Sequence, residues 1–306
     1  MQTILGASGT IGSELAASLK KYTDHIRLVC RNPKLVNDTD QLFPADLTDT
    51  EQVDKAIAGS DIVYLTVGFE YKLTAWKEKW PKLMDDVIAS CKRHRAKLVF
   101  FDNMYMYDKS EVSHMTENSR VNPPRKKGKI RAAIAQKILD EVANGTLVAL
   151  IARSADFYGP RANNNITEFI MNDLSKGKKA SWLASAGKMH NFTYTPDAGK
   201  ATALLGNTPD AYNQVWHLPT SHEKMTGKQW ITAIAQAMNV PPRFQVLPVW
   251  MMGILGIFMP QIKELSDIAY QSDRDYFFDS SKFEKRFQFS PTPTAIGIRD
   301  TVSSFR

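Results

Sequence analysis

The chain begins with a short apolar run that ends in three evenly spaced glycines. Residues 4–12 read Ile-Leu-Gly-Ala-Ser-Gly-Thr-Ile-Gly, and an amphipathic segment with Leu15 and Leu19 on one face follows at once. This order predicts a strand, a tight turn and a helix. Glycines carry no Cβ atom, so the backbone can turn sharply and approach a ligand. The helix N-terminus then presents N–H groups to an anion, which predicts a site for the pyrophosphate of a dinucleotide.

The length and composition are typical of a globular protein. The chain has 306 residues, 43% of them hydrophobic, which suffices for one large or two small domains. Met1 leads directly into the predicted first strand, so we expect no signal peptide or transit segment. Only two cysteines occur, Cys30 and Cys91, and they form no C-x-x-C pair. This usage indicates a reducing compartment, and we expect a cytoplasmic location.

Charge and histidine spacing narrow the set of partners. The net charge is +7, but the basic residues are spread along the chain apart from one cluster at residues 125–131. We therefore expect no nucleic-acid partner, while a basic surface also suits an anionic small molecule. The six histidines show no metal-binding spacing, so we expect no metal. The longest apolar stretch, residues 247–260, is too short to span a bilayer; we expect a buried helix there and no membrane contact.

Strand and helix patterns alternate through the first half of the chain. The strand patterns lie at residues 26–30, 61–67, 97–101 and 147–151, and the helix patterns at residues 80–95 and 130–143. Such alternation predicts an α/β fold with a doubly wound parallel Rossmann sheet. Ligands bind at the carboxyl ends of the strands in this architecture.

The regular alternation fades after Gly159-Pro160. We expect a dinucleotide-binding Rossmann domain over residues 1–153, with a return to the sheet near residues 190–218. A smaller, mostly helical substrate lobe is expected from residues 154–189 and 219–306.

Residues that follow the predicted strands are candidates for binding the cofactor. Arg31 stands where an acidic residue would bind the ribose of NAD, and arginine can pair with the 2′-phosphate of NADP. The alternative is a solvated loop arginine. Asp46 can accept a hydrogen bond from the adenine amine, or can cap the next helix. We expect NADP(H) in preference to NAD(H), held by Gly6, Ser8, Gly9, Thr10, Ile11, Gly12, Arg31, Asp46, Leu47, Val67 and Gly68.

Several segments together resemble those of a known superfamily. They are the glycine motif at residues 6–12, Asp-Leu-Thr-Asp at 46–49, Arg-Ser-Ala-Asp-Phe-Tyr-Gly-Pro at 153–160, Phe-Thr-Tyr-Thr-Pro-Asp at 192–197 and the tail from residue 279 to 301. In these segments the chain resembles the extended and atypical short-chain dehydrogenase/reductases, the superfamily of NAD-dependent epimerases and dehydratases. The resemblance covers nearly the whole chain. It implies a fold and a cofactor, and says much less about the substrate.

The resemblance breaks at the catalytic positions. It implies a Ser/Thr after the strand at 97–101 and a Y-x-x-x-K pair on the next helix, whose tyrosine donates or accepts a proton. In this chain Asn103 stands at the first position, and Lys127 and Arg131 stand at the tyrosine and lysine positions. The spacing i, i+4 places both basic groups on one helix face. The tyrosine-based mechanism is therefore not implied for this chain.

Three functions remain open. In the leading one, an NADP(H)-dependent oxidoreductase acts on a small carbonyl or enone compound. Arg131 would then hold the ribose and Lys127 would act as an acid, its pKa lowered by a neighbouring cation and partial burial. Tyr105 or Tyr107 is the alternative proton donor. Asn103, Tyr105, Lys127 and Arg131 are thus the candidate catalytic residues.

The second function is that of a non-catalytic NADP(H) sensor. The third is that of a nucleotide-sugar epimerase or dehydratase, with Arg125, Lys127 and Arg131 bound to a substrate phosphate. The alternative without a functional role is that these basic residues lie at an exposed, solvated start of a helix. We expect a small-molecule substrate and a monomer or homodimer.

Overall fold

A computed structural model describes residues 1–160, 162, 166–259 and 264–305. Contacts between residues divide the chain into two compact units. Unit 1 consists of residues 1–106, 126–154 and 196–218, and unit 2 of residues 107–125, 155–195 and 219–306. Residues 107–125, which we expected in the first domain, thus group with unit 2.

Unit 1 contains a parallel sheet of seven strands. Their order is β10-β6-β5-β4-β1-β2-β3, and every neighbouring pair is parallel. The strands are β1 (Gln2–Leu5), β2 (Ile26–Cys30), β3 (Gln41–Pro44), β4 (Ile62–Leu65), β5 (Lys97–Asp102), β6 (Ala149–Arg153) and β10 (Val215–His217). This is the doubly wound Rossmann order with one strand added, so the expected fold class is confirmed. All seven strands end at the same edge of the sheet, which is where ligands bind in this fold.

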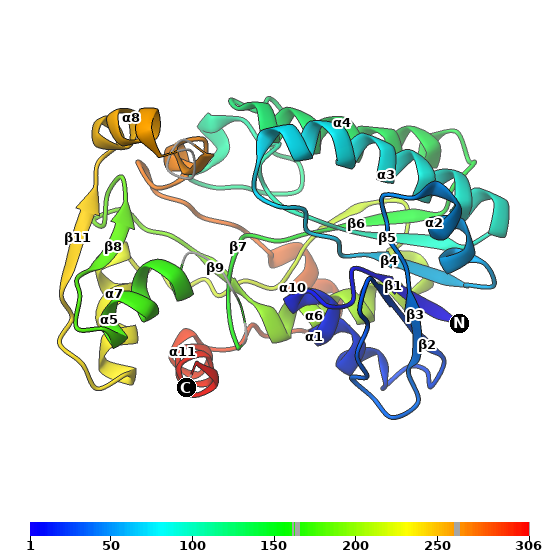
Figure 1. Cartoon of the computed structure of the whole chain (residues 1–306), viewed down its shortest axis with the longest axis horizontal. Coiled ribbons are helices and arrows are strands. Elements are labelled where there is room, and N and C mark those ends of the chain that lie inside the picture. Colours follow the sequence, from blue (N-terminus) through cyan, green and yellow to red (C-terminus); the bar gives the residue numbers. More distant parts are fainter. Residues whose placement is uncertain (161, 163–165, 260–263, 306) are drawn as a thin grey trace. The chain divides into compact units, whose positions relative to one another are not determined.

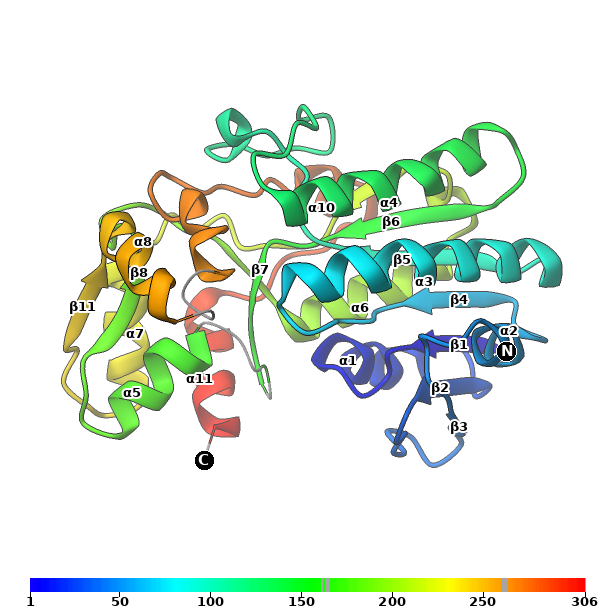
Figure 2. The same cartoon turned by 45° about the horizontal axis from the view of Figure 1, so that its top comes forward.

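Helices cover both faces of this sheet. Figures 1 and 2 show α3 and α4 on one face and α1 and α6 on the other. The helices of unit 1 are α1 (Thr10–Leu19), α2 (Thr50–Ile57), α3 (Leu73–His94), α4 (Lys126–Ala143) and α6 (Thr195–Gly206), with a short 3-10 turn at Pro209–Ala211. Every residue of β1 and β4 is buried, as expected for strands of a parallel sheet covered on both faces.

Two helices begin earlier than their sequence patterns predicted. Helix α3 starts at Leu73 rather than at Trp80, and it contains Pro81 in its interior. A proline there removes one helical hydrogen bond. Both Trp76 and Trp80 are buried in the core of unit 1, and their burial offsets that loss. Helix α4 starts at residue 126 rather than 130, so Lys127 lies in its first turn.

Unit 2 is built from two small parallel strand pairs and several helices. Strand β7 (Asp156–Tyr158) pairs with β9 (Phe192–Tyr194), and β8 (Ala180–Leu183) pairs with β11 (Phe244–Leu247). The helices are α5 (Asn172–Ser175), α7 (Gly227–Ala237), α8 (Val249–Phe258), α10 (Ser281–Phe287) and α11 (Thr294–Ser304), with 3-10 turns at Lys109–Glu111 and Ala269–Gln271 and a π-turn at Thr167–Met171. Its core includes Tyr158, Trp182, Phe192, Tyr194 and Trp230.

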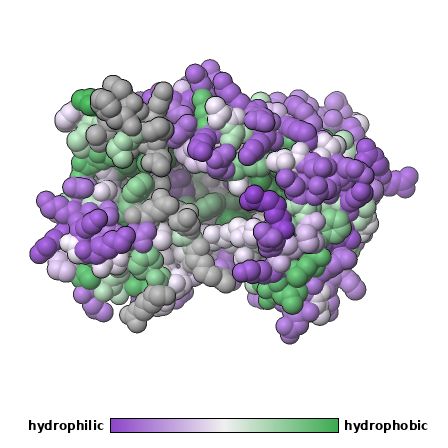
Figure 3. All heavy atoms as spheres, viewed as in Figure 1, coloured by the Kyte–Doolittle hydropathy of each residue, from purple (hydrophilic) through white to green (hydrophobic). Residues whose placement is uncertain are grey.

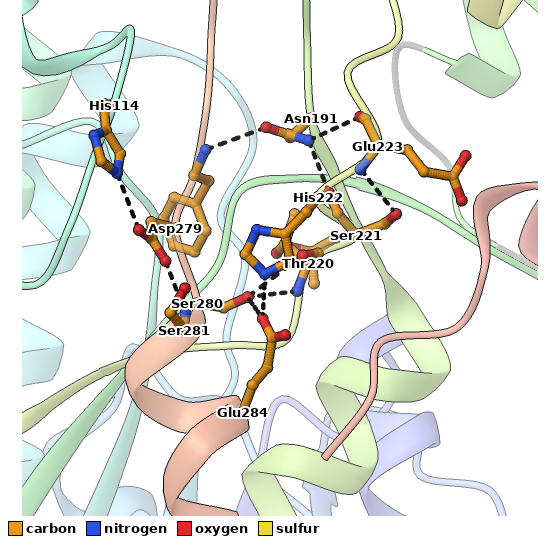
Figure 4. Close-up of polar contacts among 12 residues, drawn as sticks. His114, Asn191, Thr220, Ser221, His222, Glu223, Asp279, Ser280, Ser281 and Glu284 are labelled. Carbon is orange, nitrogen blue, oxygen red and sulfur yellow. Dashed lines mark hydrogen bonds and ion pairs between the residues drawn. The ribbon is translucent and has the colours of Figure 1, made fainter. Parts of the chain in front are cut away.

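Polar side chains connect two distant segments of unit 2 (Figure 4). The backbone N–H of Thr220 donates to the Ser280 hydroxyl over 3.0 Å, and this hydroxyl donates to the Glu284 carboxylate over 2.6 Å. The same carboxylate oxygen lies 2.7 Å from Nε2 of His222. The amide of Asn191 donates to the carbonyl oxygen of Ser221 over 2.8 Å. The bonds of Ser280 and Glu284 hold the segment after β10 against the start of α10, and the bond of Asn191 ties the same segment to the residues before β9.

The apolar stretch at residues 247–260 forms a helix whose burial differs from our expectation. Helix α8 is buried only in part. Met252 is buried, whereas Val249, Trp250 and Ile254 are exposed, and 68% of Trp250 is accessible to solvent. Figure 3 shows hydrophobic residues at the surface where Figure 1 places α8. The helix has almost no polar residue, so its sequence carries no sign of which side faces solvent. Pro260 lies outside the described residues.

No helix in the described part of the chain is long and apolar enough to cross a membrane.

Candidate functional site

The glycine turn after β1 requires two of its three glycines for packing reasons. Gly6 has a φ of +94°, and a Cβ atom there would lie 2.8 Å from the backbone nitrogen of Val67. At Gly12 a Cβ atom would lie 2.6 Å from the carbonyl oxygen of Gly6. Gly9 is less confined, since its Cβ would lie 3.4 Å from that oxygen. The first glycine thus permits the approach of β1 to β4, and the third lets α1 pack on the turn.

The N-terminus of α1 is open to an anion. The helix begins after Gly9, which has no side chain to cap it, and its first turn has no acidic residue. The first N–H groups of a helix have no partner within the helix, and the dipole makes this end positive. Ser8 and Gly9 are exposed beside it. This end of the helix therefore suits a phosphate group.

Residues after four strands line one cleft in unit 1. Its volume is about 1380 Å³ including its mouth. Of the predicted cofactor residues, Gly6, Ser8, Gly9, Arg31, Asp46, Leu47, Val67 and Gly68 line it. The lining also includes Thr48, Glu70 and Lys79, which the sequence patterns did not indicate. Lys79 was missed because α3, which carries it, was expected to begin only at Trp80.

Asp46 and Arg31 face the cleft with complementary charges. One carboxylate oxygen of Asp46 accepts from the Thr48 backbone N–H over 3.0 Å and from its hydroxyl over 2.9 Å. These two bonds, aided by the charge of Arg31, lower the pKa of Asp46. Helix α2 is capped by Asp49, whose side chain accepts from the N–H groups of residues 51 and 52. The alternative that Asp46 caps α2 is therefore wrong, and Thr48 holds Asp46 as an ionised acceptor.

Lys127, which stands at the expected tyrosine position, is buried against an aromatic ring. Only 1% of it is exposed, and its Nζ atom lies 3.6 Å from the centre of the Tyr71 ring. Such a contact stabilises a desolvated ammonium group. Tyr71 comes directly after Glu70, a residue of the cleft. The sequence offered no sign of this contact, because the two partners lie far apart along the chain.

Arg131 takes part in a buried ion-pair network. Its Nε donates to one oxygen of Asp102 over 2.8 Å, and Arg153 donates to the other oxygen over 3.2 Å. The guanidinium carbon of Arg131 also lies 4.4 Å from the Trp80 ring centre and 4.7 Å from that of Phe100. Through these contacts the Arg131 side chain packs in the core of unit 1. The solvated helix start is therefore wrong for Lys127 and Arg131, and the predicted role of Arg131 toward the cofactor stays a prediction.

The two remaining catalytic candidates follow β5. The side-chain oxygen of Asn103 accepts from the backbone N–H of Tyr105 over 3.0 Å. The Tyr105 ring stacks on Trp76 with ring centres 6.3 Å apart. Both residues are partly exposed, whereas Tyr107 belongs to unit 2 and is buried. Their chemistry stays a prediction. Among the residues that the structure describes, no cluster of three His, Cys, Asp or Glu side chains offers a metal site.

The residues of unit 1 fit a bound dinucleotide. The glycine turn leaves backbone accessible where a Cβ would otherwise intrude, the uncapped helix end suits a pyrophosphate, and Asp46 and Arg31 line the same cleft. Together the Rossmann sheet and this cleft have the features of a dinucleotide-binding domain.

Comparison with known families agrees with this class. Residues 6–152 match a family model described as NAD(P)H-binding. Over these residues the chain is similar to NAD(P)H-binding domains, which agrees with the resemblance drawn from the sequence motifs. No curated protein matches the chain by sequence.

Solved structures share the fold of the whole chain. UDP-glucose 4-epimerase of Thermus thermophilus, in complex with NAD, has a TM-score of 0.81 at 18% identity and covers 100% of this chain and 99% of its own. UDP-glucuronic acid 4-epimerase of Bacillus cereus, with UDP-glucuronic acid and NAD, has a TM-score of 0.82 at 16% identity and the same coverage. UDP-N-acetylglucosamine 4-epimerase of Methanobrevibacter ruminantium M1 has a TM-score of 0.81 at 17% identity, covering 99% and 97%. At these identities the similarity shows the fold alone.

Proposed function

We propose that the protein is an NADP(H)-dependent oxidoreductase that acts on a small carbonyl or enone compound. The observation that carries the cofactor part is the position of Arg31 in the cleft that also contains the glycine turn and Asp46. Arg31 is exposed and forms no salt bridge with another described residue, so its guanidinium is available to a phosphate.

Different residues of the cleft would bind different parts of the cofactor. Gly6 and Gly9, with the N-terminus of α1, would hold the pyrophosphate, and Arg31 the 2′-phosphate. Asp46 would accept a hydrogen bond from the adenine amine. The bound nicotinamide would supply or accept a hydride. Lys127 is the proposed proton donor through Nζ, and Tyr71 would hold its ammonium group in place.

A second function is favoured by the comparisons. The solved structures that share the fold include nucleotide-sugar 4-epimerases bound to NAD and UDP-sugars. An epimerase recycles its nicotinamide, whereas the proposed oxidoreductase consumes it. Net oxidation of NADPH in the presence of substrate therefore separates the two functions.

A third function, a non-catalytic NADP(H) sensor, is favoured by the replaced catalytic pair. Lys127 contacts Tyr71 and Arg131 contacts Asp102, so neither replacement has the freedom of a surface residue. A sensor would bind NADPH tightly and would not turn it over with any carbonyl compound.

A fluorescence titration tests the common part of these functions. NADPH and NADH are each titrated into the purified protein, and the two dissociation constants are compared. Tight binding with a clear preference for NADPH supports the proposal and justifies a screen of carbonyl compounds for NADPH oxidation. Weak binding of both cofactors would contradict the proposal.

A further inference from the structure

One surface of unit 2 combines exposed apolar side chains with exposed cations. It follows residues 241–254, which run through β11 into α8, and we call it the β11–α8 surface. Arg243 is exposed just before β11, Val246 within this strand, and Val249 at the start of α8. Because these residues belong to unit 2, the surface is separate from the cofactor cleft of unit 1. Exposed apolar residues that gather in one place, in contrast to single ones, indicate an interaction surface.

The apolar part of this surface is one face of α8. Trp250, Gly253 and Ile254 are spaced i, i+3 and i+4, so they lie on the same side of the helix, and all three are exposed. Trp250 is 68% exposed and Ile254 52%, whereas Met252 on another side of the helix is buried. The helix therefore turns apolar side chains both toward unit 2 and away from it. Tryptophan is the residue that membrane proteins place at the boundary between lipid and water.

The charged part of the surface lies where β8 and β11 begin. Lys178, Lys179 and Arg243 are exposed there and line an open depression, in which Asp173 is the one acidic residue of the described lining. The two strands are parallel and four residues long, so roughly 13 Å of strand separates these cations from α8. Figure 1 shows α8 at the far end of both strands, and Figure 3 shows hydrophilic residues at the surface where the strands begin.

The charge of the chain distinguishes between the occupants that could cover this surface. The net charge is +7, and the depression beside the strands adds local positive charge, so two copies of the chain repel each other at this face. An anionic lipid surface instead attracts the chain and these cations. We propose that the β11–α8 surface docks the protein on an anionic phospholipid bilayer. Lys178, Lys179 and Arg243 would contact the headgroups, and Trp250 and Ile254 would enter the boundary with the acyl chains.

This contact is peripheral and does not require a spanning helix. We expected no membrane contact because residues 247–260 are too short to cross a bilayer. A helix that lies in the interface has no such requirement, since only one of its faces enters the lipid. The proposal does not depend on the proposed oxidoreductase function, because its residues lie outside the cofactor cleft.

Co-sedimentation of the full chain with lipid vesicles tests the proposal. One set of vesicles is phosphatidylcholine alone, and the other contains equal amounts of phosphatidylcholine and phosphatidylserine. We expect at least about tenfold tighter binding to the mixed vesicles, because each cation near an anionic surface strengthens binding about fivefold. Salt at about 1 M should weaken this binding, because it shortens the screening length from about 10 Å to about 3 Å. Equal affinity for both vesicles, or binding to neither, would overturn the proposal.

One variant tests the apolar part of the surface. Trp250→Glu places a charge where the helix face would enter the lipid, so binding to the mixed vesicles should weaken at least about tenfold. The matched control is Tyr22→Glu, which makes the same change of charge at an aromatic residue of unit 1 that is 43% exposed. The control should bind nearly as the wild type does. Equal losses in the two variants would show that only net charge matters and would contradict docking through α8.

A pair of double variants tests the charged part. Lys178→Ala combined with Lys179→Ala should weaken binding to the mixed vesicles at least about tenfold. Lys21→Ala combined with Lys285→Ala removes the same charge from exposed positions elsewhere and serves as the control. If both double variants lose the same affinity, the cations beside β8 have no special role in docking.

A second copy of the chain is the competing occupant of the surface. Sedimentation velocity without lipid compares the wild type with Trp250→Glu, and we expect the same sedimentation coefficient for both. A wild-type dimer that Trp250→Glu dissociates would assign the surface to a second copy and overturn the proposal. Circular dichroism checks that the variants fold, and a separate NADPH titration shows that a failure here is independent of the cofactor proposal.

Discussion

The Nζ atom of Lys127 lies 3.6 Å from the centre of the Tyr71 ring. Lys127 occupies the position at which the family resemblance implies a catalytic tyrosine. The contact therefore brings a phenol ring and an ammonium group together in unit 1. The ammonium group stands at the tyrosine position of the Y-x-x-x-K pair, and the phenol ring comes from Tyr71, outside that pair. Tyr71 also follows Glu70, which lines the cofactor cleft.

The ring of Tyr71 should matter more for stability than its hydroxyl. Tyr71→Leu removes the ring that contacts a buried ammonium group and should lower the free energy of unfolding by about 1–2 kcal/mol. Tyr71→Phe keeps the ring and should cost less than about half as much. Urea unfolding of the two variants measures the difference. Equal losses would show that the cation–ring contact contributes little.

Arg31→Ala should change the choice of cofactor. Loss of a charge-assisted contact to a 2′-phosphate should weaken NADPH binding at least about tenfold and leave NADH binding nearly unchanged. The matched control is Arg299→Ala at an exposed position of α11. Fluorescence titrations with both cofactors supply the ratio of the two dissociation constants. If this ratio is the same in Arg31→Ala and the wild type, Arg31 is a solvated loop residue.

Gly12→Ala should destabilise unit 1. The new Cβ atom would lie 2.6 Å from the carbonyl oxygen of Gly6, which is backbone and cannot rotate away. Overpacking of this kind costs about 1–3 kcal/mol. Gly253→Ala in α8 is the control, since nothing lies within 4 Å of its added Cβ, and it should be neutral or slightly stabilising. Thermal unfolding of both variants makes the comparison, and similar melting temperatures would contradict the packing role of Gly12.

Asp102→Asn should be among the most damaging changes to the core of unit 1. Asp102 is 1% exposed and pairs with Arg131 and Arg153, so the variant removes the negative charge that both buried guanidinium groups contact. Breaking a buried pair in this way costs about 3–5 kcal/mol. The same substitution at Asp85, whose pair with Lys137 is exposed, should cost less than about 1 kcal/mol. Denaturant unfolding distinguishes them, and equal losses would show that the network is dispensable.

Acid should weaken the fold partly through Asp279 in unit 2. Burial raises the pKa of Asp279, but the hydrogen bonds from His114 and Ser281 outweigh it and bring the pKa from 3.8 to about 2 (Figure 4). A lowered pKa in the folded state stabilises the fold above pH 3.8, and this contribution is lost as the pH falls toward 2. Asp279→Asn should therefore show a smaller loss of stability over this interval.

The measurement for Asp279 is the free energy of unfolding of wild type and variant at several pH values from 5 to about 2. His114→Ala serves as a second variant, because removing the hydrogen bond from His114 should move the acid transition of Asp279 to higher pH. Parallel pH curves for Asp279→Asn and the wild type would rule out the contribution.

Much of the cofactor cleft could be predicted from the sequence. The glycine spacing and the alternation of strands and helices are local patterns, and in a parallel sheet all strands end at one edge. Residues within three positions of the ends of β1, β2, β3 and β4, such as Gly6, Arg31, Asp46 and Gly68, were therefore expected to meet there. The start of α3 was predicted incorrectly because Pro81 resembles a helix boundary when the burial of Trp76 is unknown.

The sequence by itself determined the Rossmann fold class and the residues at the strand ends, because both follow from short-range patterns and from the geometry of a parallel sheet. Only the tertiary structure decided the surroundings of Lys127 and Arg131. Their partners Tyr71 and Asp102 lie 29 or more residues away along the chain, and no local pattern specifies such contacts. Packing brings these groups together, and packing depends on the shape of the whole folded unit.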